Sequence, residues 1–232
     1  IKNSLDILNS GRCGEFSQSA VNFLSMASRN VKNLSGIIND LLDLSKIEAG
    51  KMDFKFKPTD INTVIDYVKS TLSEVAKSKG INLYTDKYEN MPEINADSQR
   101  LEQVLTNLVS NAIKFTPEGK NIRIVSKPIN ANDIKINDYF KDKITNLDGD
   151  YIMVCVEDEG IGIAEQDLLR AFDKFAQIEN SLSRKAGGTG LGLPIAKQLL
   201  DAHKGAIWCD SELNKGSKFY FIIPIMKKAL TV

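Results

Sequence analysis

The sequence is poor in the residues that many common functional sites require. It has a single histidine, His203, and its three cysteines, Cys13, Cys155 and Cys209, are odd in number and far apart. This spacing fits neither a disulfide framework nor a zinc knuckle, so a reducing compartment is the simpler expectation. The sequence also has no excess of basic residues, because 30 lysines and arginines balance 30 acidic residues. We therefore expect no contact with nucleic acid.

Long apolar runs and a signal peptide are absent from the sequence too. The longest purely apolar stretches fall far short of the roughly 20 residues that cross a bilayer, so we expect a cytoplasmic chain with no membrane contact of its own. The chain starts at Ile1 without a methionine and already in a helical pattern. We expect it to be a piece of a longer protein, which leaves room for an anchor upstream.

Residues 1–50 predict a helical hairpin. A short helical pattern ends near Gly11 and Gly14, and residues 17–49 then run almost without helix breakers. Apolar and small residues recur there in steps of three and four, at the seam positions of a coiled coil: Val21, Leu24, Ser28, Val31, Ser35, Ile38, Leu42 and Ser45. Further leucines widen the stripe, which favours half of a dimeric four-helix bundle. Packing against the rest of the chain is the alternative.

Residues 51–232 predict a separate α+β domain, a two-layer sandwich with helices on one face of a mixed sheet. Strands are expected near 52–56, 81–88, 121–126, 151–157, 206–211 and 218–225. Helices are expected near 60–79, within 97–119, near 164–172 and near 193–203. The 151–157 strand is apolar enough to be central. The polar stretch 127–150 is predicted to be an insertion in a hairpin, and no function is assigned to it.

The stretch from Asp97 to Gly119 predicts a helix with two different sides. One side is broad and apolar, whereas the other carries Gln103, Asn107, Asn111 and Lys114, spaced four, four and three residues apart. Asparagine is a mediocre helix former, so two in mid-helix suggest a role beyond helix formation. A solvated face is one interpretation. The other is a magnesium–phosphate site, because amide oxygens suit Mg²⁺ and a lysine suits phosphate.

Two glycine-rich stretches follow. Residues 158–162 read D-E-G-I-G at a strand exit, and residues 188–193 read G-T-G-L-G-L just before a helix. Glycines before a helix often hold an anion on free backbone N–H groups. The second stretch fits neither the dinucleotide-binding nor the P-loop spacing. Either turn alone is compatible with simple tight packing.

Together these motifs resemble the ATP-binding domain of the bacterial sensor histidine kinases, which shares its fold with gyrase, mismatch-repair and chaperone ATPases. The motifs occur in the family's order: N-x-x-x-N-x-x-K-F-T at 107–116, D-x-G-x-G at 158–162, F-x-x-F at 172–175 and G-T-G-L-G-L at 188–193. Residues 38–50, INDLLDLSKIEAG, resemble the end of the second helix of the kinase dimerisation domain. The resemblance covers nearly the whole chain except 127–150.

The resemblance implies a role for each matching residue. Asn111 would be the magnesium ligand, Asn107 would lie beside the terminal phosphates, and Lys114 would contact phosphate. Asp158 would accept a hydrogen bond from the adenine amino group. Residues 177–188 would form a flexible lid. The remaining nucleotide contacts would come from Phe115, Gly160, Gly162, Lys185, Gly188, Thr189, Gly190, Leu191, Gly192 and Ser217, the last one through water.

The sequence departs from the family pattern at the phosphoacceptor. No H-E-x-x-T/N-P box is present, so the histidine is expected upstream of residue 1, and autophosphorylation by this chain alone is not expected. His203 lies where kinases commonly carry His-Gly-Gly, and we interpret it as a charge and cap at a helix C-terminus.

The leading hypothesis is an ATP–magnesium-dependent kinase core that passes phosphate to that histidine and then to a response-regulator receiver domain. A nucleotide-binding pseudokinase or scaffold dimer is the alternative. A hydrolytic clamp is disfavoured, because such ATPases place a glutamate where Asn107 stands.

Overall fold

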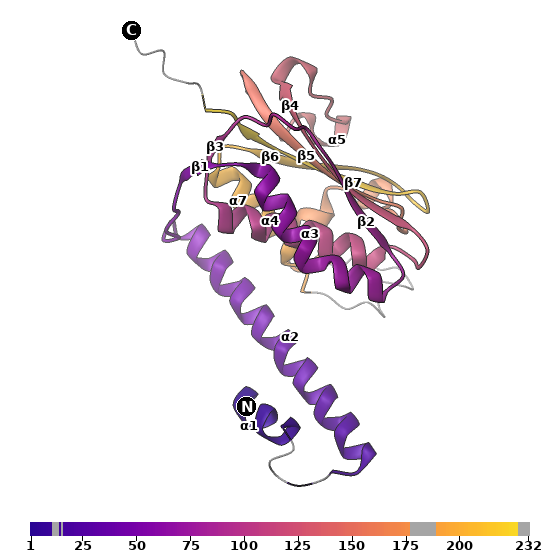
Figure 1. Ribbon diagram of the computed structural model, residues 1–232. Helices are drawn as coiled ribbons and strands as arrows, with labels where there is room; N and C mark the ends of the chain where they lie inside the picture. Colours follow the sequence, from indigo (N-terminus) through magenta and orange to yellow (C-terminus); the bar gives the residue numbers. More distant parts are fainter. Residues whose placement is uncertain (11–13, 15, 177–188, 227–232) are drawn as a thin grey trace. The chain divides into compact units, whose positions relative to one another are not determined.

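The computed structural model describes residues 1–232 except 11–13, 15, 177–188 and 227–232, and the chain divides into two compact units, Ile1–Met52 and Asp53–Val232. The first unit is helical, as predicted. It contains α1 (Lys2–Asn9) and α2 (Gln18–Glu48), which contact each other (Figure 1). With 31 residues, α2 is about 46 Å long.

Helix α2 carries many exposed apolar side chains. Leu34 is 55% exposed and Leu42 52%, although both belong to a helical apolar pattern. The other exposed apolar side chains of α2 are Val21, Phe23, Met26, Ile37, Ile38 and Leu41. A single helix with such a surface has no core of its own.

The second unit is built on a five-stranded mixed sheet in the order β2-β4-β5-β7-β6 (Figure 1). In that order the strands are β2 (Asn82–Lys87), β4 (Asn121–Asn130), β5 (Asp150–Asp158), β7 (Gly216–Pro224) and β6 (Ala206–Glu212). Only β2 and β4 are parallel, and every other neighbouring pair is antiparallel. The apolar β5 is the central strand, as its composition predicted. A separate two-stranded ladder pairs β1 (Lys57–Thr59) with β3 (Ile94–Ala96).

Three helices cover one face of this sheet (Figure 1): α3 (Ile61–Ser78), α4 (Ser98–Phe115) and α7 (Gly192–Ala202). The core lies between the two layers. For example, Ile207, Phe221 and Val154 form one row across β6, β7 and β5, and the latter two are fully buried. This is the predicted α+β sandwich.

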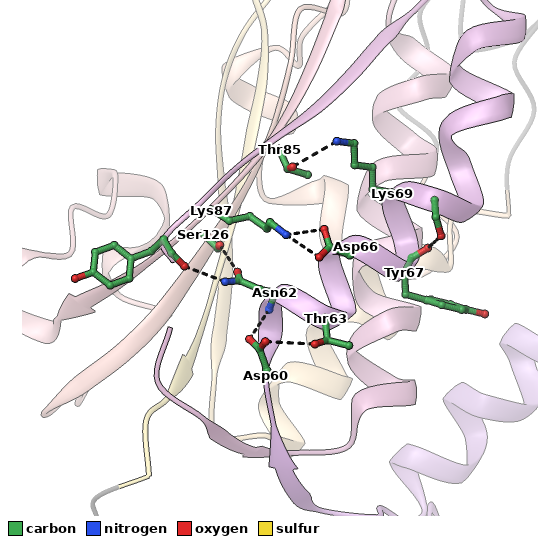
Figure 2. A network of polar contacts seen from close by, with 11 residues as sticks. Asp60, Asn62, Thr63, Asp66, Tyr67, Lys69, Thr85, Lys87 and Ser126 are labelled. Atoms are coloured by element: carbon green, nitrogen blue, oxygen red, sulfur yellow. Dashed lines mark hydrogen bonds and ion pairs between the residues drawn. The ribbon is translucent and has the colours of Figure 1, made fainter. Parts of the chain in front are cut away.

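Helix α3 is fixed to the edge of the sheet by polar contacts (Figure 2). Asp60 caps the helix by accepting a hydrogen bond from the Asn62 backbone N–H at 2.9 Å. The Asn62 amide donates to the Tyr88 carbonyl and accepts from the Ser126 hydroxyl, and Lys87 pairs with Asp66 at 2.6 Å. These contacts connect α3 to β2 and β4.

Two predicted elements are wrong. Residues 52–56 form no strand; the alternating Phe54 and Phe56 pack instead against the His203 ring, with centroids 5.8 and 5.0 Å away. The helix expected at 164–172 is two 3₁₀ turns, η2 (Glu165–Asp167) and η3 (Arg170–Phe172). In these turns the backbone N–H of residue i+3 donates a hydrogen bond to the carbonyl of residue i. This geometry places side chains three residues apart on the same side, and Leu168 and Ala171 are both buried.

The polar insertion begins later than predicted, because β4 continues through Asn130 and pairs with β5 up to Asp150. The connection that remains, residues 131–149, contains η1 (Ala131–Asp133) and α5 (Asp138–Lys141). It joins antiparallel neighbours, as an insertion in a hairpin should. None of the described helices has the length and apolar content to cross a membrane.

Candidate functional site

Helix α4 is the element that positions the candidate site. Asp97 caps its start by accepting hydrogen bonds from the backbone N–H groups of Gln99 (3.1 Å) and Arg100 (3.2 Å). The second carboxylate oxygen accepts from the Lys55 N–H at 2.8 Å. The predicted apolar side is buried throughout: Leu101, Val104, Leu105, Leu108, Val109, Ala112 and Ile113. With this side in the core, the polar side of the helix has a fixed direction.

The polar side of α4 is not simply a solvated face. The Asn107 amide donates a hydrogen bond to the backbone carbonyl of Gly192, the first residue of α7, at 3.0 Å. A Cβ on Gly192 would lie 3.4 Å from the Asn107 side chain, so the two elements are in close contact. Asn111 follows one turn later on the same stripe and is partly buried.

The turn that follows β5 contacts the C-terminal end of α4. The Ile161 N–H donates to the Phe115 carbonyl at 3.3 Å. A Cβ on Gly160 would lie 2.7 Å from that carbonyl oxygen, and a Cβ on Gly162 would lie 2.0 Å from the Glu212 carbonyl oxygen. No larger residue fits at these two positions without moving backbone. The D-x-G-x-G glycines therefore permit a close approach of three backbone segments.

Asp158 is held in this turn. Its carboxylate is only 6% exposed and accepts hydrogen bonds from the backbone N–H groups of Gly160 (2.9 Å) and Ser217. Burial raises the pKa of Asp158 to about 6, and the two N–H groups act in the opposite direction. The carboxylate is thus ionised at neutral pH and presents a buried acceptor.

Ser211 supports the same turn and was missed by sequence reasoning. Its hydroxyl accepts from the Ile163 N–H at 2.8 Å and donates to the Gly216 carbonyl at 2.9 Å. It also lies 3.0 Å from the Ser217 hydroxyl, directly across the β6–β7 pair. The only signal in the sequence is a serine on each side of the N-K-G turn.

The glycine-rich turn before α7 is described from Thr189 onward. The Thr189 hydroxyl accepts from the Leu191 N–H at 3.1 Å, and Leu191 itself is fully buried. Gly190 has φ +68°, and a Cβ there would lie 2.8 Å from the Phe175 backbone. Helix α7 begins without a side-chain cap, and the N–H groups of its first two residues, Gly192 and Leu193, have no partner within the helix. Two predicted contacts, Lys185 and Gly188, lie outside the described residues, as does the expected lid at 177–188.

These contacts bring most of the predicted site residues to one stretch of α4. Asn107 contacts the α7 start, and Phe115 contacts the β5 exit two helical turns further on, a rise of about 12 Å. Asn111 lies between them on the same stripe. Asp158, Gly160, Gly162 and Ser217 gather at one end of this stretch, and Gly190, Leu191 and Gly192 gather at the other.

Lys114 is less firmly connected to the rest. It is half-buried, and burial, with a smaller effect from Lys79, lowers its pKa. Its Nζ lies 4.6 Å from the Phe115 ring centroid, whereas Lys79 donates to the Ile113 carbonyl at 3.1 Å. The described contact of Lys114 is thus with its own helix, and the nearby charge of Lys79, at the C-cap of α3, repels it.

The prediction that His203 supplies a charge is wrong. His203 is 3% exposed, and burial lowers its pKa, so the ring is neutral. Its Nε2 accepts from the Asp97 N–H at 3.0 Å, and its Nδ1 lies 2.7 Å from the Leu199 carbonyl, to which it donates. The ring does cap α7, and it also connects the end of α7 to the start of α4.

The fold and this arrangement of turns define an ATPase-type nucleotide domain, and comparison with known proteins identifies the family. Residues 96–227 match the model of the "Histidine kinase-, DNA gyrase B-, and HSP90-like ATPase" family. The chain belongs to this family. Within it, the similarity is to the ATP-binding catalytic core of sensor histidine kinases.

Two relatives show the extent of the match. The chain is 36% identical over 214 residues to the sensor histidine kinase GacS of Pseudomonas protegens, covering 92% of this chain and 22% of that protein. It is 38% identical over 201 residues to the signal transduction histidine-protein kinase BarA of Escherichia coli K12, covering 86% and 20%. The chain thus spans about a fifth of the length of these curated relatives.

Solved structures agree with this fold. Full-length ShkA in complex with AMPPNP superposes with a TM-score of 0.74 at 25% identity, covering all of this chain and 44% of that one. The histidine kinase AdeS of Acinetobacter baumannii superposes with a TM-score of 0.65 at 23% identity, covering 97% of this chain and 95% of that one, which supports the fold alone.

Proposed function

We propose that this chain is the kinase core of a two-component sensor kinase and binds ATP along the Asn107–Phe115 stretch of α4. The observation that carries the proposal is the pair of contacts that join this stretch to the α7 start and to the β5 exit. Asn111 lies between the two turns. A nucleotide placed along this stretch would span from a buried carboxylate at one end to uncapped helix N–H groups at the other.

The two ends suit the two ends of ATP. The Asp158 carboxylate is an acceptor for the adenine amino group, and the nearby Ser217 hydroxyl suits a water-mediated contact to the base. At the other end, the N–H groups of α7 and the Gly190 turn suit the phosphates, because an uncapped helix N-terminus attracts anions. Asn107 would lie beside the terminal phosphates. Lys114 lies next to Phe115, near the other end of the stretch, and would reach a phosphate through its long side chain.

The residues present fit a magnesium ion held together with the phosphates. The Asn111 side chain forms no hydrogen bond to the described residues, which leaves its amide oxygen available as a ligand. Among the described residues no cluster of three histidine, cysteine or acidic side chains forms an all-protein metal site. Magnesium commonly binds through substrate phosphates plus one or two protein oxygens, and when bound it neutralises developing phosphate charge.

The proposed reaction transfers the γ-phosphoryl group of ATP to a histidine nitrogen of the longer protein. The bond from the γ-phosphorus to the bridging oxygen breaks, ADP leaves with that electron pair, and a phosphorus–nitrogen bond forms. A response-regulator aspartate would later accept the phosphoryl group. The chain's contribution is positioning and charge neutralisation. The structure of ThkA in complex with the response regulator TrrA, similar in fold, is compatible with such a partner.

Calorimetry tests the nucleotide site. ATP is expected to bind in the presence of magnesium, and Asn111→Ala is expected to remove the magnesium-dependent part of the affinity. Ser110→Ala, an exposed neighbour on the same helix, is the matched control and should leave the affinity unchanged. Unchanged affinity in Asn111→Ala would refute the assignment of the ligand.

Labelled ATP tests the reaction. A protein extended upstream to include a His-Glu pair is expected to form acid-labile, alkali-stable phosphate. Phosphoserine chemistry would contradict the proposal. Binding of ATP without any phosphorylation of the extended protein would instead favour a nucleotide-binding scaffold.

A further inference from the structure

A cavity lies on the second unit, away from the proposed nucleotide site. It has a volume of about 330 Å³ and lies between the C-terminal half of α7, the start of β6, η3 and residues 140–147 of the β4–β5 connection. Ligand pockets commonly have such a volume. None of the residues assigned to the nucleotide lines it.

The inner wall of this cavity is apolar and well packed. Phe140, Tyr151 and Ile207 line it and are each at most 6% exposed. Phe140 meets Phe172 edge to face, with ring centroids 5.6 Å apart. An aromatic wall held in this way offers a rigid surface for a flat apolar body.

The rim of the cavity has more cations than anions. Lys197, Asp201 and Lys204 follow each other on one face of α7 and its end, and Lys143 approaches from the β4–β5 connection. Asp173 is the other acid of the lining. Burial raises the pKa of Asp201, and the positive charge of Lys197 acts in the opposite direction. Among the described residues, no carboxylate lies within 4.0 Å of the Lys143 or Lys204 ammonium group.

The backbone at the rim is strained. Lys204 has φ +58° and Asn146 has φ +61°, and both line the cavity. The left-handed region is unfavourable for a lysine, whereas glycine adopts it freely. Lys204 takes this conformation because it closes α7: its N–H donates to the Asp201 carbonyl, and the Gly205 N–H donates to the Leu200 carbonyl. The helix end thus places Lys204 in the lining of the cavity.

We propose that this cavity binds a small organic anion, with its apolar body against Phe140 and Phe172 and its carboxylate, sulfonate or phosphate group between Lys143 and Lys204. The aromatic wall would contact the apolar body of the ligand, and the two unpaired lysines would bind its anionic group. The site would be independent of ATP, because the two sets of lining residues do not overlap.

Fluorescence titration with anilinonaphthalene sulfonate, an aromatic sulfonate, tests this site. One molecule is expected to bind per chain, and ATP with magnesium should not displace it. Lys204→Gly is expected to weaken binding about tenfold, the usual effect of losing a charge-assisted hydrogen bond. The same substitution should raise the melting temperature, because it relieves the left-handed strain. Loss of binding in a more stable variant is not explained by unfolding.

Matched variants separate charge from strain. Lys204→Arg should retain binding, and Lys143→Gln should weaken it. Asn214→Gly relieves a similar strain, φ +64°, in the β6–β7 turn, which does not line the cavity, and should leave binding unchanged. Equal affinity in the original protein, Lys204→Gly and Lys143→Gln would overturn the proposal. Displacement of the probe by ATP would also overturn it.

Discussion

At the scale of single residues, the buried Asp158 carboxylate is the specificity determinant that the account proposes. The carboxylate accepts hydrogen bonds from two backbone N–H groups and Asp158 is 6% exposed, so the carboxylate has a fixed direction and little water around it. An acceptor in this setting favours a partner that donates a hydrogen bond. The adenine amino group is such a partner.

Replacing Asp158 is therefore expected to weaken nucleotide binding selectively. A charged hydrogen bond contributes roughly 1.5 to 3 kcal/mol, so Asp158→Asn should lower ATP affinity about tenfold to a hundredfold. Glu159→Gln makes the same change in charge at the next residue, whose carboxylate bonds to Asn121 instead, and should have little effect. Calorimetry measures both. Equal losses in the two variants would contradict a specific role for Asp158.

The raised pKa of Asp158 predicts a pH dependence of binding. Because the ionised form accepts the hydrogen bond and burial raises the pKa to about 6, affinity should be full above that pH. It should fall as pH drops through 6, approaching tenfold per pH unit. Protonation of ATP itself also contributes, so the slope is compared with that of Asp158→Asn. We expect a steeper slope for the original protein; parallel slopes would rule out Asp158 as the titrating group.

At the scale of elements, α4 is the part on which the site depends. Its apolar side is buried, its start is capped by Asp97, and its polar side reaches the two glycine turns. His203 connects the start of α4 to the end of α7, so the two helices that bracket the candidate site are joined directly. A change at the Asp97 cap is thus expected to affect both stability and binding.

Substitution of the Asp97 cap tests this dependence. Asp97→Ala removes the acceptor for the N–H groups of Gln99 and Arg100, and should lower the free energy of unfolding by about 1 to 2 kcal/mol. Asp97→Asn retains a capping oxygen and should lose less. Urea unfolding can be followed through Trp208, the single tryptophan, which is buried. If the two variants were equally destabilised, capping would not be the cause.

The sequence predicts these elements well where periodicity is strong. The seven apolar positions of α4 are all buried, and the apolar β5 is central, because in both cases burial itself sets the pattern. The prediction of a strand fails where apolar residues alternate in the sequence for a reason other than strand formation. Phe54 and Phe56 alternate like a strand but pack on a histidine that is distant in sequence.

The candidate site was only partly predictable for a similar reason. Short motifs marked the two glycine turns, and the structure brings both turns to α4. Ser211 carries no motif, and its role follows only from the pairing of β6 with β7. The neutral state of His203 likewise depends on burial by Phe54 and Phe56, which no local pattern indicates.

At the scale of the whole molecule, the exposed apolar surface of α2 predicts a partner. Leu34, Ile38 and Leu42 are spaced by four residues and are each about half exposed. A coiled-coil pattern with such exposure favours association of two copies into a four-helix bundle. We therefore expect a homodimer through residues 1–50.

Sedimentation tests the dimer. Ile38→Glu places a charge on the proposed seam in both copies, and should weaken association at least tenfold, because burying an unpaired carboxylate is unfavourable. Lys32→Glu changes an exposed position on the same helix and should alter association far less. A monomer at micromolar concentration in the original protein would refute the expectation.

The most direct test of the central claim is a map of backbone amide shifts in the second unit on addition of AMPPNP with magnesium. The largest changes are expected at Asn111, Gly160 and Gly192, since the nucleotide is expected to lie along one stretch of α4. Amides around Lys143 and Lys204 should change little. Changes concentrated at the cavity that Lys143 and Lys204 line, or scattered over separate surfaces, would contradict this placement of the nucleotide.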